Sequence, residues 1–560
     1  MKKRVIIIGG GAAGSMAALT AAQNGADVLL LEQNEMIGRK ILSTGNGRCN
    51  FTNRFQDPSC YRSDNSGFAW KSIGKFSEPE TTSFFKNLGI YTKDKNGYLY
   101  PWSEQASAVR EALESALKLA KIRIHTGVRV FGIIPKKNGF QISFSKDGKK
   151  GMISGEAVIL AAGSKAAAKL GSDGSGYDLA KMLGHKLVPV VPALVQLRCR
   201  EKLYRQVAGV RTHGKVTVFI DGTETASDIG ELQLTDYGIS GIPVFQISRY
   251  AARGLYEKKE VFAELDFMPD FGDVEFLQML KERKIRLDGL VMEQYFNGLF
   301  HKKLAGALLK RIGISGTMPV HDLSEENLER LCRICKHFRT YIDKTNPFEQ
   351  AQICAGGVDT SEIDPDTMES KLVKGLYFAG EILDVDGICG GYNLQWAWPV
   401  GFGQGKERQM LRISQLKLPV THTEEDLKKK IVHTLMCRTE AVQSYEIIKQ
   451  SLDARKKPEL FYVYTVDVKA DNEKQLLKML TRKKRAGNVQ LHEAMPYVFP
   501  AGGNEKLKSR PVVVGCGPAG LFCAYFLAEY GYQPVLLEQG APVEERQKDV
   551  EEFWKTGVLK

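Results

Sequence analysis

The stretch VIIIGGGAAGSMAALTAAQNGADVLLLEQN, residues 5–34, decides the fold of this chain. A short apolar run leads into Gly9, Gly11 and Gly14, and an alanine-rich segment then leads into a second apolar run that ends at Glu32. Strand, glycine turn, helix and strand in this order form the opening βαβ unit of a dinucleotide-binding fold. The first glycine permits the tight turn, the second lets the backbone approach a pyrophosphate, and the third brings helix and strand together.

Glu32 and Gln33 close this unit. Glu32 lies 23 positions after Gly9, where an acid can bind the ribose hydroxyls of an adenosine. A carboxylate there disfavours a 2′-phosphate, so the site suits FAD or NAD better than NADP. A glycine turn without a ligand is the alternative reading of the motif taken alone.

A second copy of the pattern, PVVVGCGPAGLFCAYFLAEYGYQPVLLEQG, lies at residues 511–540. Its Gly515, Gly517, Gly520 and Glu538 keep the spacing of the first copy without a gap. A dinucleotide fold needs further βα units, and only 22 residues follow Glu538. We therefore predict an incomplete, marginally stable βαβ unit here, because its parallel strands lack the neighbours that would bury them, and we predict no working ligand site.

The composition is that of a soluble globular protein of several domains. Hydrophobic residues make up 43% and charged residues 26% of the 560 residues, and no apolar run is long enough to span a membrane. We expect cytoplasmic localisation, with the ten cysteines reduced. The spacing of Cys332 and Cys335 fits packing on an amphipathic helix better than a redox or half-metal motif, and we predict no metal site.

The formal charge of +13 is uneven along the chain. Residues 1–190 carry +12, residues 191–420 carry −2, and residues 421–560 carry +3. A basic face could steer the phosphates of a cofactor or of RNA, and a solvated surface is the simpler alternative.

Periodicity and turn signals divide the chain into five parts. We predict a nucleotide-binding domain that starts at 1–190 and includes a β-meander over 123–163, an insertion that is first β-rich and then helical, and a return to the first domain. A basic linker at 411–419 and a small α/β domain follow, before the incomplete unit. The predicted ranges are 1–190, 191–345, 346–410, 420–505 and 506–560.

Three further segments favour FAD over NAD as the bound cofactor. The loop MIGRKILSTGNGRCNFTN, residues 36–53, is rich in glycine and cations, which suits a pyrophosphate and the flavin beyond it. An apolar strand ends at Ala162 and Gly163, and the segment GLYFAGEILDVDG at 375–387 supplies another strand that ends in Gly380 and Glu381.

These motifs resemble a known family. The loop at 36–53, GYDLAKMLGH at 176–185, TDYGISG at 235–241 and SKLVKGLYFAGEILDVDGICGGYNLQWAW at 370–398 look like the BaiN/RdsA-type FAD-dependent oxidoreductases, which have a glutathione-reductase-like FAD-binding fold. The resemblance covers about residues 1–410. The expected cofactor-binding residues, from motifs and resemblance together, are Gly9, Gly11, Gly14, Glu32, Gln33, Arg39, Lys40, Thr44, Gly45, Gly47, Val130, Ala162, Gly163, Gly380, Glu381, Asn393 and Leu394.

The resemblance implies reduction of a C=C bond conjugated to a carbonyl. The substrate would be a steroid-like small molecule or uridine in ribosomal RNA. In the hypothesis adopted here, NAD(P)H reduces FAD, flavin N5 delivers hydride to the β-carbon, and an acid protonates the α-carbon. Residues 1–410 hold one complete GxGxxG motif, so NAD(P)H would bind transiently at the flavin face.

The proton donor is open between Cys49 and Tyr392, with Tyr237 a weaker candidate. His185 reads as a structural residue after a helix-ending glycine. A helix starting near residues 391–393 would place its positive end at the reduced flavin.

Three hypotheses remain open at this stage. They are a reductase of a small enone, a dihydrouridine synthase acting on ribosomal RNA, and an inactive flavin-binding remnant of a gene fusion. An RNA enzyme should surround the flavin cleft with basic residues, and a steroid reductase should line it with apolar ones. Residues 421–560 resemble the start of a second FAD-dependent dehydrogenase family, and the oligomeric state stays open.

Overall fold

The computed structural model describes residues 3–402, 409–456, 459–470, 473–483, 485–493, 509–529 and 531–558. The chain forms two compact units, Met1–Gly405 and Lys406–Lys560, and each is described by itself.

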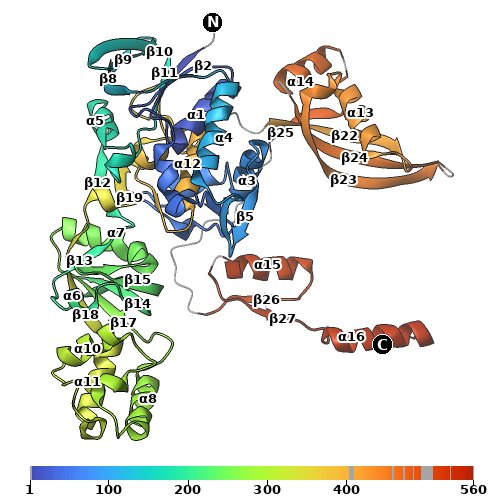
Figure 1. Cartoon of the computed structure of the whole chain (residues 1–560). Helices are drawn as coiled ribbons and strands as arrows, with labels where there is room; N and C mark the ends of the chain where they lie inside the picture. Colours follow the sequence, from blue (N-terminus) through green and yellow to red (C-terminus); the bar gives the residue numbers. More distant parts are fainter. Residues whose placement is uncertain are drawn as a thin grey trace. The chain divides into compact units, whose positions relative to one another are not determined.

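The first unit is built on a five-stranded parallel sheet (Figure 1). The strand order is β20-β11-β1-β2-β7. The strands are β1 (Arg4–Ile8), β2 (Asp27–Leu31), β7 (Arg123–His125), β11 (Ala157–Leu160) and β20 (Leu376–Phe378). Strands β1, β2 and β11 are almost wholly apolar because both faces of the sheet are covered. Strand β20 pairs in parallel with β11. The residues after β20 therefore lie at the carboxyl ends of the strands, where the glycine turn after β1 also lies.

Helices and an antiparallel meander cover the two faces of this sheet. Helix α1 (Ala12–Gln23) connects β1 with β2 and packs against α12 (Tyr392–Phe402). On the other face a Cβ atom at Gly155, the last residue of the meander, would lie 2.8 Å from the Ile6 side chain. The meander consists of β8 (Val128–Lys136), β9 (Gly139–Lys146) and β10 (Lys149–Gly155). The predicted meander is thus present, although residues 123–125 form the edge strand β7 of the parallel sheet instead.

Smaller elements surround the sheet. They are β3 (Thr52–Asn53), β4 (Tyr61–Arg62), α2 (Phe68–Ile73), α3 (Glu78–Asn87), β5 (Thr92–Lys95), β6 (Tyr98–Pro101), α4 (Ala106–Leu119), α5 (Ser175–Met182) and β21 (Asp386–Gly387). Strand β21 pairs with β4, which joins the segment before α12 to the segment after the glycine-rich loop.

Two antiparallel strands, β12 (Leu187–Ala193) and β19 (Ile353–Val358), connect the inserted domain, residues 194–352, to the first domain. It contains a closed six-stranded barrel of order β13-β16-β15-β14-β17-β18. Its strands are β13 (Leu197–Cys199), β14 (Arg211–Ile220), β15 (Thr223–Leu234), β16 (Gly238–Ser240), β17 (Val261–Asp266) and β18 (Phe338–Thr345). Its helices are α6 (Tyr204–Val207), α7 (Ile242–Tyr256), α8 (Asp273–Arg286), α9 (Met292–Tyr295), α10 (Lys302–Arg311) and α11 (Glu325–Lys336).

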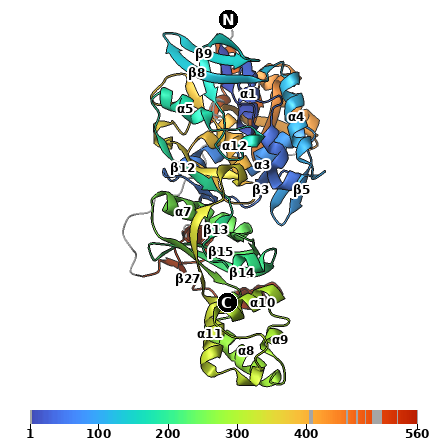
Figure 2. The same ribbon diagram turned by 60° about the vertical axis from the view of Figure 1, so that its left-hand side comes forward.

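The sequence predicted strands followed by helices in this insertion. The structure differs in two respects. Helix α7 lies within the part predicted to be β-rich, and β18 follows the later helices and pairs with β13 and β17 to close the barrel. Figures 1 and 2 both place this domain and the β8–β10 meander at opposite ends of the first unit.

The predicted linker at residues 411–419 is instead a strand of the second unit. Residues 411–419 lie in strand β22 (Gln409–Pro419), between β24 and β25 in a four-stranded antiparallel sheet. Alternate side chains Leu411 and Ile413 are fully buried, which is why this basic-looking segment forms a strand. The other elements are α13 (Glu424–Leu435), β23 (Val442–Lys456), β24 (Glu459–Ala470), α14 (Glu473–Arg482) and β25 (Val489–Glu493).

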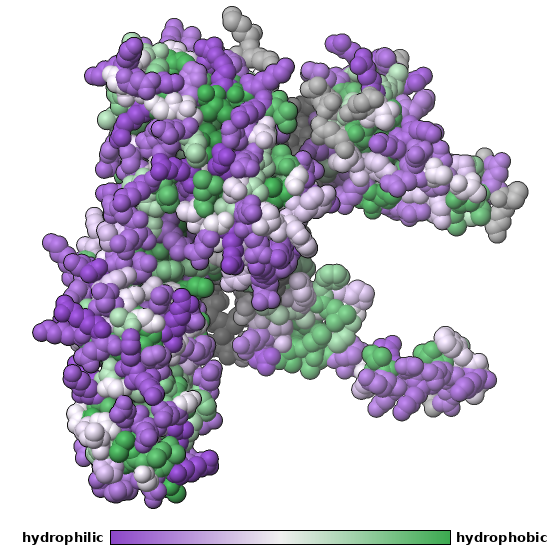
Figure 3. Space-filling model, in the orientation of Figure 1, coloured by the Kyte–Doolittle hydropathy of each residue, from purple (hydrophilic) through white to green (hydrophobic). Residues whose placement is uncertain are grey.

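The repeated motif forms the predicted βαβ arrangement in the second unit. It comprises β26 (Val512–Val514), α15 (Pro518–Glu529), β27 (Val535–Leu537) and then α16 (Val543–Thr556). Strands β26 and β27 form a two-stranded parallel sheet, and Val514 is 81% exposed whereas its counterpart Ile8 is 5% exposed. Leu521 and Phe522 of α15 are exposed as well, and Figure 3 shows apolar surface in green over this helix.

Candidate active site

The glycine turn between β1 and α1 has the geometry of a pyrophosphate site. A Cβ atom at Gly14 would lie 1.9 Å from the Gly9 carbonyl oxygen, and one at Gly9 would lie 2.4 Å from the Ala161 carbonyl oxygen. A Cβ atom at Gly11 would meet no protein atom within 4 Å. Gly11 is also the N-cap of α1 and offers no side chain to the first turn. The open surface and the uncapped helix start therefore fit the diphosphate of a dinucleotide.

Glu32 is built into this turn. It follows β2, is 6% exposed, and its carboxylate accepts hydrogen bonds from the backbone N–H groups of Gly10 at 2.6 Å and Asn34 at 2.8 Å. These bonds hold the acid at the edge of the turn, where ribose hydroxyls are expected. The neighbouring Gln33 donates to the Gly171 carbonyl.

The glycine-rich loop starts as a short 3-10 segment, Arg39–Gly47, and then turns. Gly45 and Gly47 adopt left-handed backbone conformations, and both are exposed, as is Arg39. Thr44 Oγ1 donates to the Ile41 carbonyl at 2.6 Å. The loop thus presents backbone and a cation to solvent.

Lys40 and Glu381 join this loop to the return segment. Lys40 Nζ lies 2.6 Å from Glu381 Oε2, which also accepts a hydrogen bond from Ser164 Oγ at 3.2 Å. A Cβ atom at Gly380 would lie 2.7 Å from the Ala13 Cβ atom in the first turn of α1. The structure therefore brings together three of the predicted segments, from residues 9–14, 39–47 and 380–381.

The start of α12 agrees with the predicted helix start near residues 391–393. Asn393 uses its side-chain amide on the preceding turn, since it accepts from the Gly387 N–H at 2.8 Å and donates to the Gly387 carbonyl at 2.9 Å. Its structural role is therefore to shape the turn before the helix. Leu394 is partly buried against the main core.

The remaining predicted cofactor residues lie in the meander and after strand β11. Val130 is buried in β8, and Ala162 and Gly163 follow β11. Gly163 has a φ of 73°, and a Cβ atom there would lie 3.0 Å from the Ser172 Cβ atom. Ser172 Oγ has no hydrogen-bond partner among the described residues.

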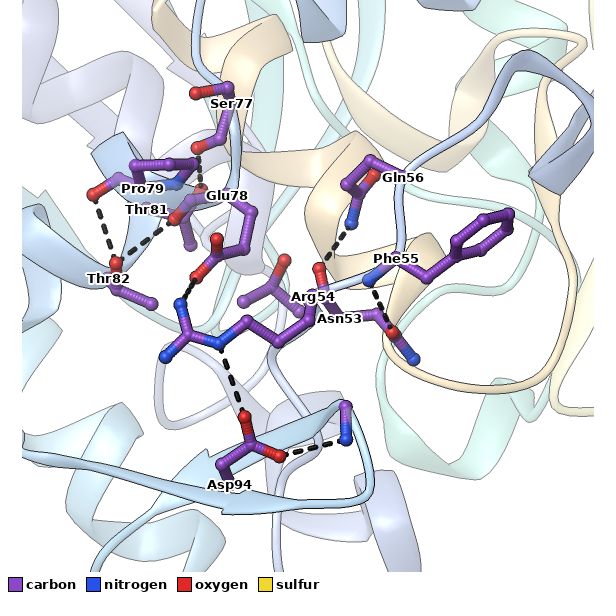
Figure 4. A network of polar contacts seen from close by, with 12 residues as sticks. Asn53, Arg54, Phe55, Gln56, Ser77, Glu78, Pro79, Thr81, Thr82 and Asp94 are labelled. Carbon is purple, nitrogen blue, oxygen red and sulfur yellow. Dashed lines mark hydrogen bonds and ion pairs between the residues drawn. The ribbon is translucent and has the colours of Figure 1, made fainter. Parts of the chain in front are cut away.

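A polar network fixes the far end of the glycine-rich loop (Figure 4). Arg54 lies 2.9 Å from Glu78 in α3 and 3.2 Å from Asp94 in β5. Asn53 donates to the Gly390 carbonyl at 3.0 Å, and this bond ties the loop to the segment before α12.

The two predicted proton donors do not suit that role in the structure. Cys49 has no exposed surface, and burial raises the pKa of its thiol to about 12. Tyr392 is also buried, burial raises the pKa of its hydroxyl, and the hydroxyl contacts Cys60. A side chain without exposed surface cannot reach a ligand, so Cys49 is corrected to a core residue. Tyr237 contacts Asn346 Nδ2 at 3.0 Å inside the insertion.

His185 and the Cys332–Cys335 pair have the structural roles that the sequence predicted. The His185 ring is buried between Glu362 and Ser370, with ring nitrogens 3.0 Å and 2.9 Å from their side-chain oxygens. Both cysteines are buried on α11. Within the described ranges there is no cluster of three or more His, Cys, Asp or Glu residues suited to a metal, and no helix long and apolar enough to cross a membrane.

Sequence patterns missed a group of charges between α7 of the inserted domain and the segment before α12. Arg249 lies 3.0 Å from Asp386, and Arg253 lies 2.5 Å from Asp64 and 3.7 Å from Asp384. The alternating acids of LDVDG were the available signal, but their partners stand far away in the chain.

Comparison with known proteins agrees with this architecture. Residues 3–407 match the family described as HI0933-like protein Rossmann domain, and residues 410–469 match a domain of unknown function. The latter range starts with β22, in line with the corrected boundary.

Two similar proteins cover the first unit's length. A 3-dehydro-bile acid delta(4,6)-reductase of Clostridium scindens is 48% identical over 72% of this chain and 98% of its own. A ribosomal RNA dihydrouridine synthase of Escherichia coli is 30% identical over 70% of this chain and 94% of its own.

A solved structure, the 3-ketosteroid-delta4-(5alpha)-dehydrogenase of Rhodococcus jostii RHA1, is 14% identical over 72% of this chain and 97% of that chain, with a TM-score of 0.34. A score this low carries no argument of its own. The family match and the two relatives do, and the chain therefore belongs to the HI0933-like (BaiN/RdsA-type) family of FAD-dependent oxidoreductases, with a further domain after it.

Proposed function

We propose that this protein reduces a C=C bond conjugated to a carbonyl in a steroid-like small molecule, with NAD(P)H as the reductant. The observation that carries the proposal is the 48% identity to a bile-acid reductase over 98% of that relative. The ribosomal RNA dihydrouridine synthases are 30% identical.

The residues of the site suit FAD. The open surface at Gly11 and the start of α1 would receive the diphosphate, and Glu32 would receive the adenosine ribose. The exposed loop around Gly45 and Gly47 would follow the diphosphate toward the flavin. The proposed contacts in full are Gly9, Gly11, Gly14, Glu32, Gln33, Arg39, Lys40, Thr44, Gly45, Gly47, Val130, Ala162, Gly163, Gly380, Glu381, Asn393 and Leu394.

When bound, the flavin would take a hydride from NAD(P)H and pass it to the β-carbon while a proton reaches the α-carbon, which oxidises NAD(P)H to NAD(P)+ and saturates the C=C bond. The chain contributes the positive end of α12, which would favour negative charge on a neighbouring group by about 0.3–2 kcal/mol. Asn393 holds the turn that aims this helix start.

The RNA alternative makes a different demand on surface charge. It expects the basic residues of 1–190 to surround the site. Several of them, Lys136, Lys137, Lys146, Lys149 and Lys150, lie instead on the β8–β10 meander, at the end of the unit opposite the inserted domain (Figure 2). Arg39 and Lys40, however, lie in the glycine-rich loop of the proposed site. Surface charge therefore serves both readings, and the small-molecule reading rests on the identity to the bile-acid reductase.

Anaerobic half-reactions separate the parts of this proposal. The purified protein should carry FAD, and its flavin band should bleach with NADH or NADPH. After photochemical reduction, which bypasses NAD(P)H, a steroid enone should restore the flavin band and yield the saturated ketone by mass spectrometry.

The parallel arm uses ribosomal RNA from a strain that lacks dihydrouridine. If this RNA reoxidises the reduced flavin and gains dihydrouridine, while the steroid does not react, the RNA alternative replaces the proposal. Bleaching by neither nicotinamide nucleotide would remove NAD(P)H from it and leave the substrate class standing.

A further inference from the structure

Helix α7 crosses from the inserted domain to the segment that leads into α12. Its residues Val244, Ile247 and Ala251 are buried in the core of the inserted domain. Gln246, Arg249 and Arg253 stand at i, i+3 and i+7 and therefore share the opposite face. All three contact the first domain.

Each of these contacts reaches the short segment 384–389. Gln246 Oε1 accepts a hydrogen bond from the Cys389 N–H at 2.9 Å. Arg249 Nη2 lies 3.0 Å from Asp386 Oδ1, and Arg253 Nη2 lies 3.7 Å from Asp384 Oδ1. One helix of the insertion thus contacts residues 384, 386 and 389 of the segment just before α12.

The Arg249–Asp386 pair is the most deeply buried of these contacts. The two side chains are 9% and 1% exposed. They lie at ion-pair distance without hydrogen-bond geometry, and among the described residues neither Asp386 oxygen has a hydrogen-bond partner. A buried charge without its partner is strongly unfavourable, so the state in which both side chains are dry requires both domains to be in contact. Opening the interface would let water reach both charges.

Asp386 is also linked to the start of α12. Its neighbour Gly387 is held on both backbone polar groups by the Asn393 amide, in the first turn of that helix. Asp386 itself pairs with Arg62 through the β21–β4 ladder. A change at Arg249 therefore reaches Asn393 at the helix start through Asp386 and Gly387.

We propose that Arg249 is a positioning residue: its ion pair with Asp386 latches the inserted domain onto segment 384–389 and fixes the turn that aims the start of α12. This inference rests on the proposed function for its catalytic consequence. The latch itself is a statement about these side chains alone.

Titration of Asp386 gives the latch a pH signature. Burial raises the pKa of this carboxyl to about 6, while Arg249, Arg62 and Arg253 oppose the rise and Asp384 adds to it. Below that pH the acid becomes neutral and the ion pair is lost. In the unaltered protein, the rate at which a steroid enone reoxidises the reduced flavin should therefore rise with pH through this range.

The first test compares the reoxidation of reduced flavin by a steroid enone in three variants. Arg249→Met should lower the rate about tenfold with full FAD content, and Arg249→Lys should recover most of it. The matched control is Arg200→Met, because Arg200 pairs with Asp343 at 2.9 Å on the same domain but with side chains 66% and 45% exposed. Asp386→Asn should hold the rate at its low-pH value at every pH.

The second test needs no substrate. Hydrogen exchange of the Gly387 and Cys389 amides should become faster in Arg249→Met and stay unchanged in Arg200→Met. Unchanged exchange in folded Arg249→Met would overturn the latch, and so would loss of FAD or a rate within about twofold of the unaltered protein. If the enone fails to reoxidise the unaltered protein while exchange responds as stated, the proposed function fails and the latch stands.

Discussion

Gly11 and Gly14 stand three positions apart in one turn, yet a side chain at each would meet different surroundings. At Gly14 a Cβ atom would overlap the Gly9 carbonyl, whereas at Gly11 it would enter open space. Gly14 is therefore required by the protein's own packing, and Gly11 is needed only if something else occupies the space beside it.

We accordingly expect opposite results from two alanine variants. Gly14→Ala should destabilise the first unit by about 1–3 kcal/mol through overpacking. Gly11→Ala should cost less than about 1 kcal/mol at this N-cap position but weaken FAD binding at least about tenfold. Urea unfolding and flavin titration measure the two effects.

Gly517→Ala is the matched control, since a Cβ atom at this counterpart also meets nothing within 4 Å. It should leave both quantities unchanged. Unaltered FAD affinity in Gly11→Ala would place the cofactor elsewhere.

Burial also decides the chemistry of Cys49. With a pKa near 12 and no exposed surface, its thiol should not react with iodoacetamide at neutral pH in the folded protein. The exposed Cys523 serves as the positive control, read by peptide mass spectrometry. Cys49→Ala should keep turnover within about threefold, and a loss of several hundredfold would return Cys49 to the list of proton donors.

At the scale of elements, the segment after α5 depends on a buried histidine. His185 bridges Glu362 and Ser370, and burial lowers the pKa of its ring despite the neighbouring Glu362. The folded protein therefore binds a proton at this ring less readily than the unfolded chain does.

The sign of the pH effect follows from this difference. As the pH falls below the ordinary histidine value of 6.5, the unfolded chain takes up a proton that the folded chain does not, and the free energy of unfolding decreases. His185→Gln should remove this part of the dependence, and the exposed His213→Gln should not. Urea unfolding followed by tryptophan fluorescence reports mainly on the first unit, where the buried Trp396 and Trp398 lie.

At the scale of the whole molecule, the two units have separate cores. The boundary matters for strand β22, since Leu411, Ile413 and Leu416 are buried in the core of the second unit. Without this strand, β24 and β25 lose the neighbour that lies between them.

A fragment of residues 409–493 should therefore unfold cooperatively, whereas one of residues 421–493 should not fold. Far-ultraviolet circular dichroism during a urea titration distinguishes the two. A cooperative transition in the shorter fragment would return residues 411–419 to the role of linker.

The sequence by itself determined the local chemistry of the first domain. The glycine turn, Glu32 and the start of α12 all follow from patterns within a few residues, because turns and helix starts are set by near neighbours. The same local rules predicted the βαβ shape of the repeated motif, and they agree with the exposure of Val514.

Only the tertiary structure decided what depends on distant partners. Residues 411–419 look basic and linker-like until β24 and β25 pair with them. Cys49 looks reactive until the core encloses it. Arg249 meets Asp386 because α7, which begins in the inserted domain, also reaches the segment before α12. Burial and long-range ion pairing arise from the packing of segments far apart in the chain, so no short stretch of sequence contains them.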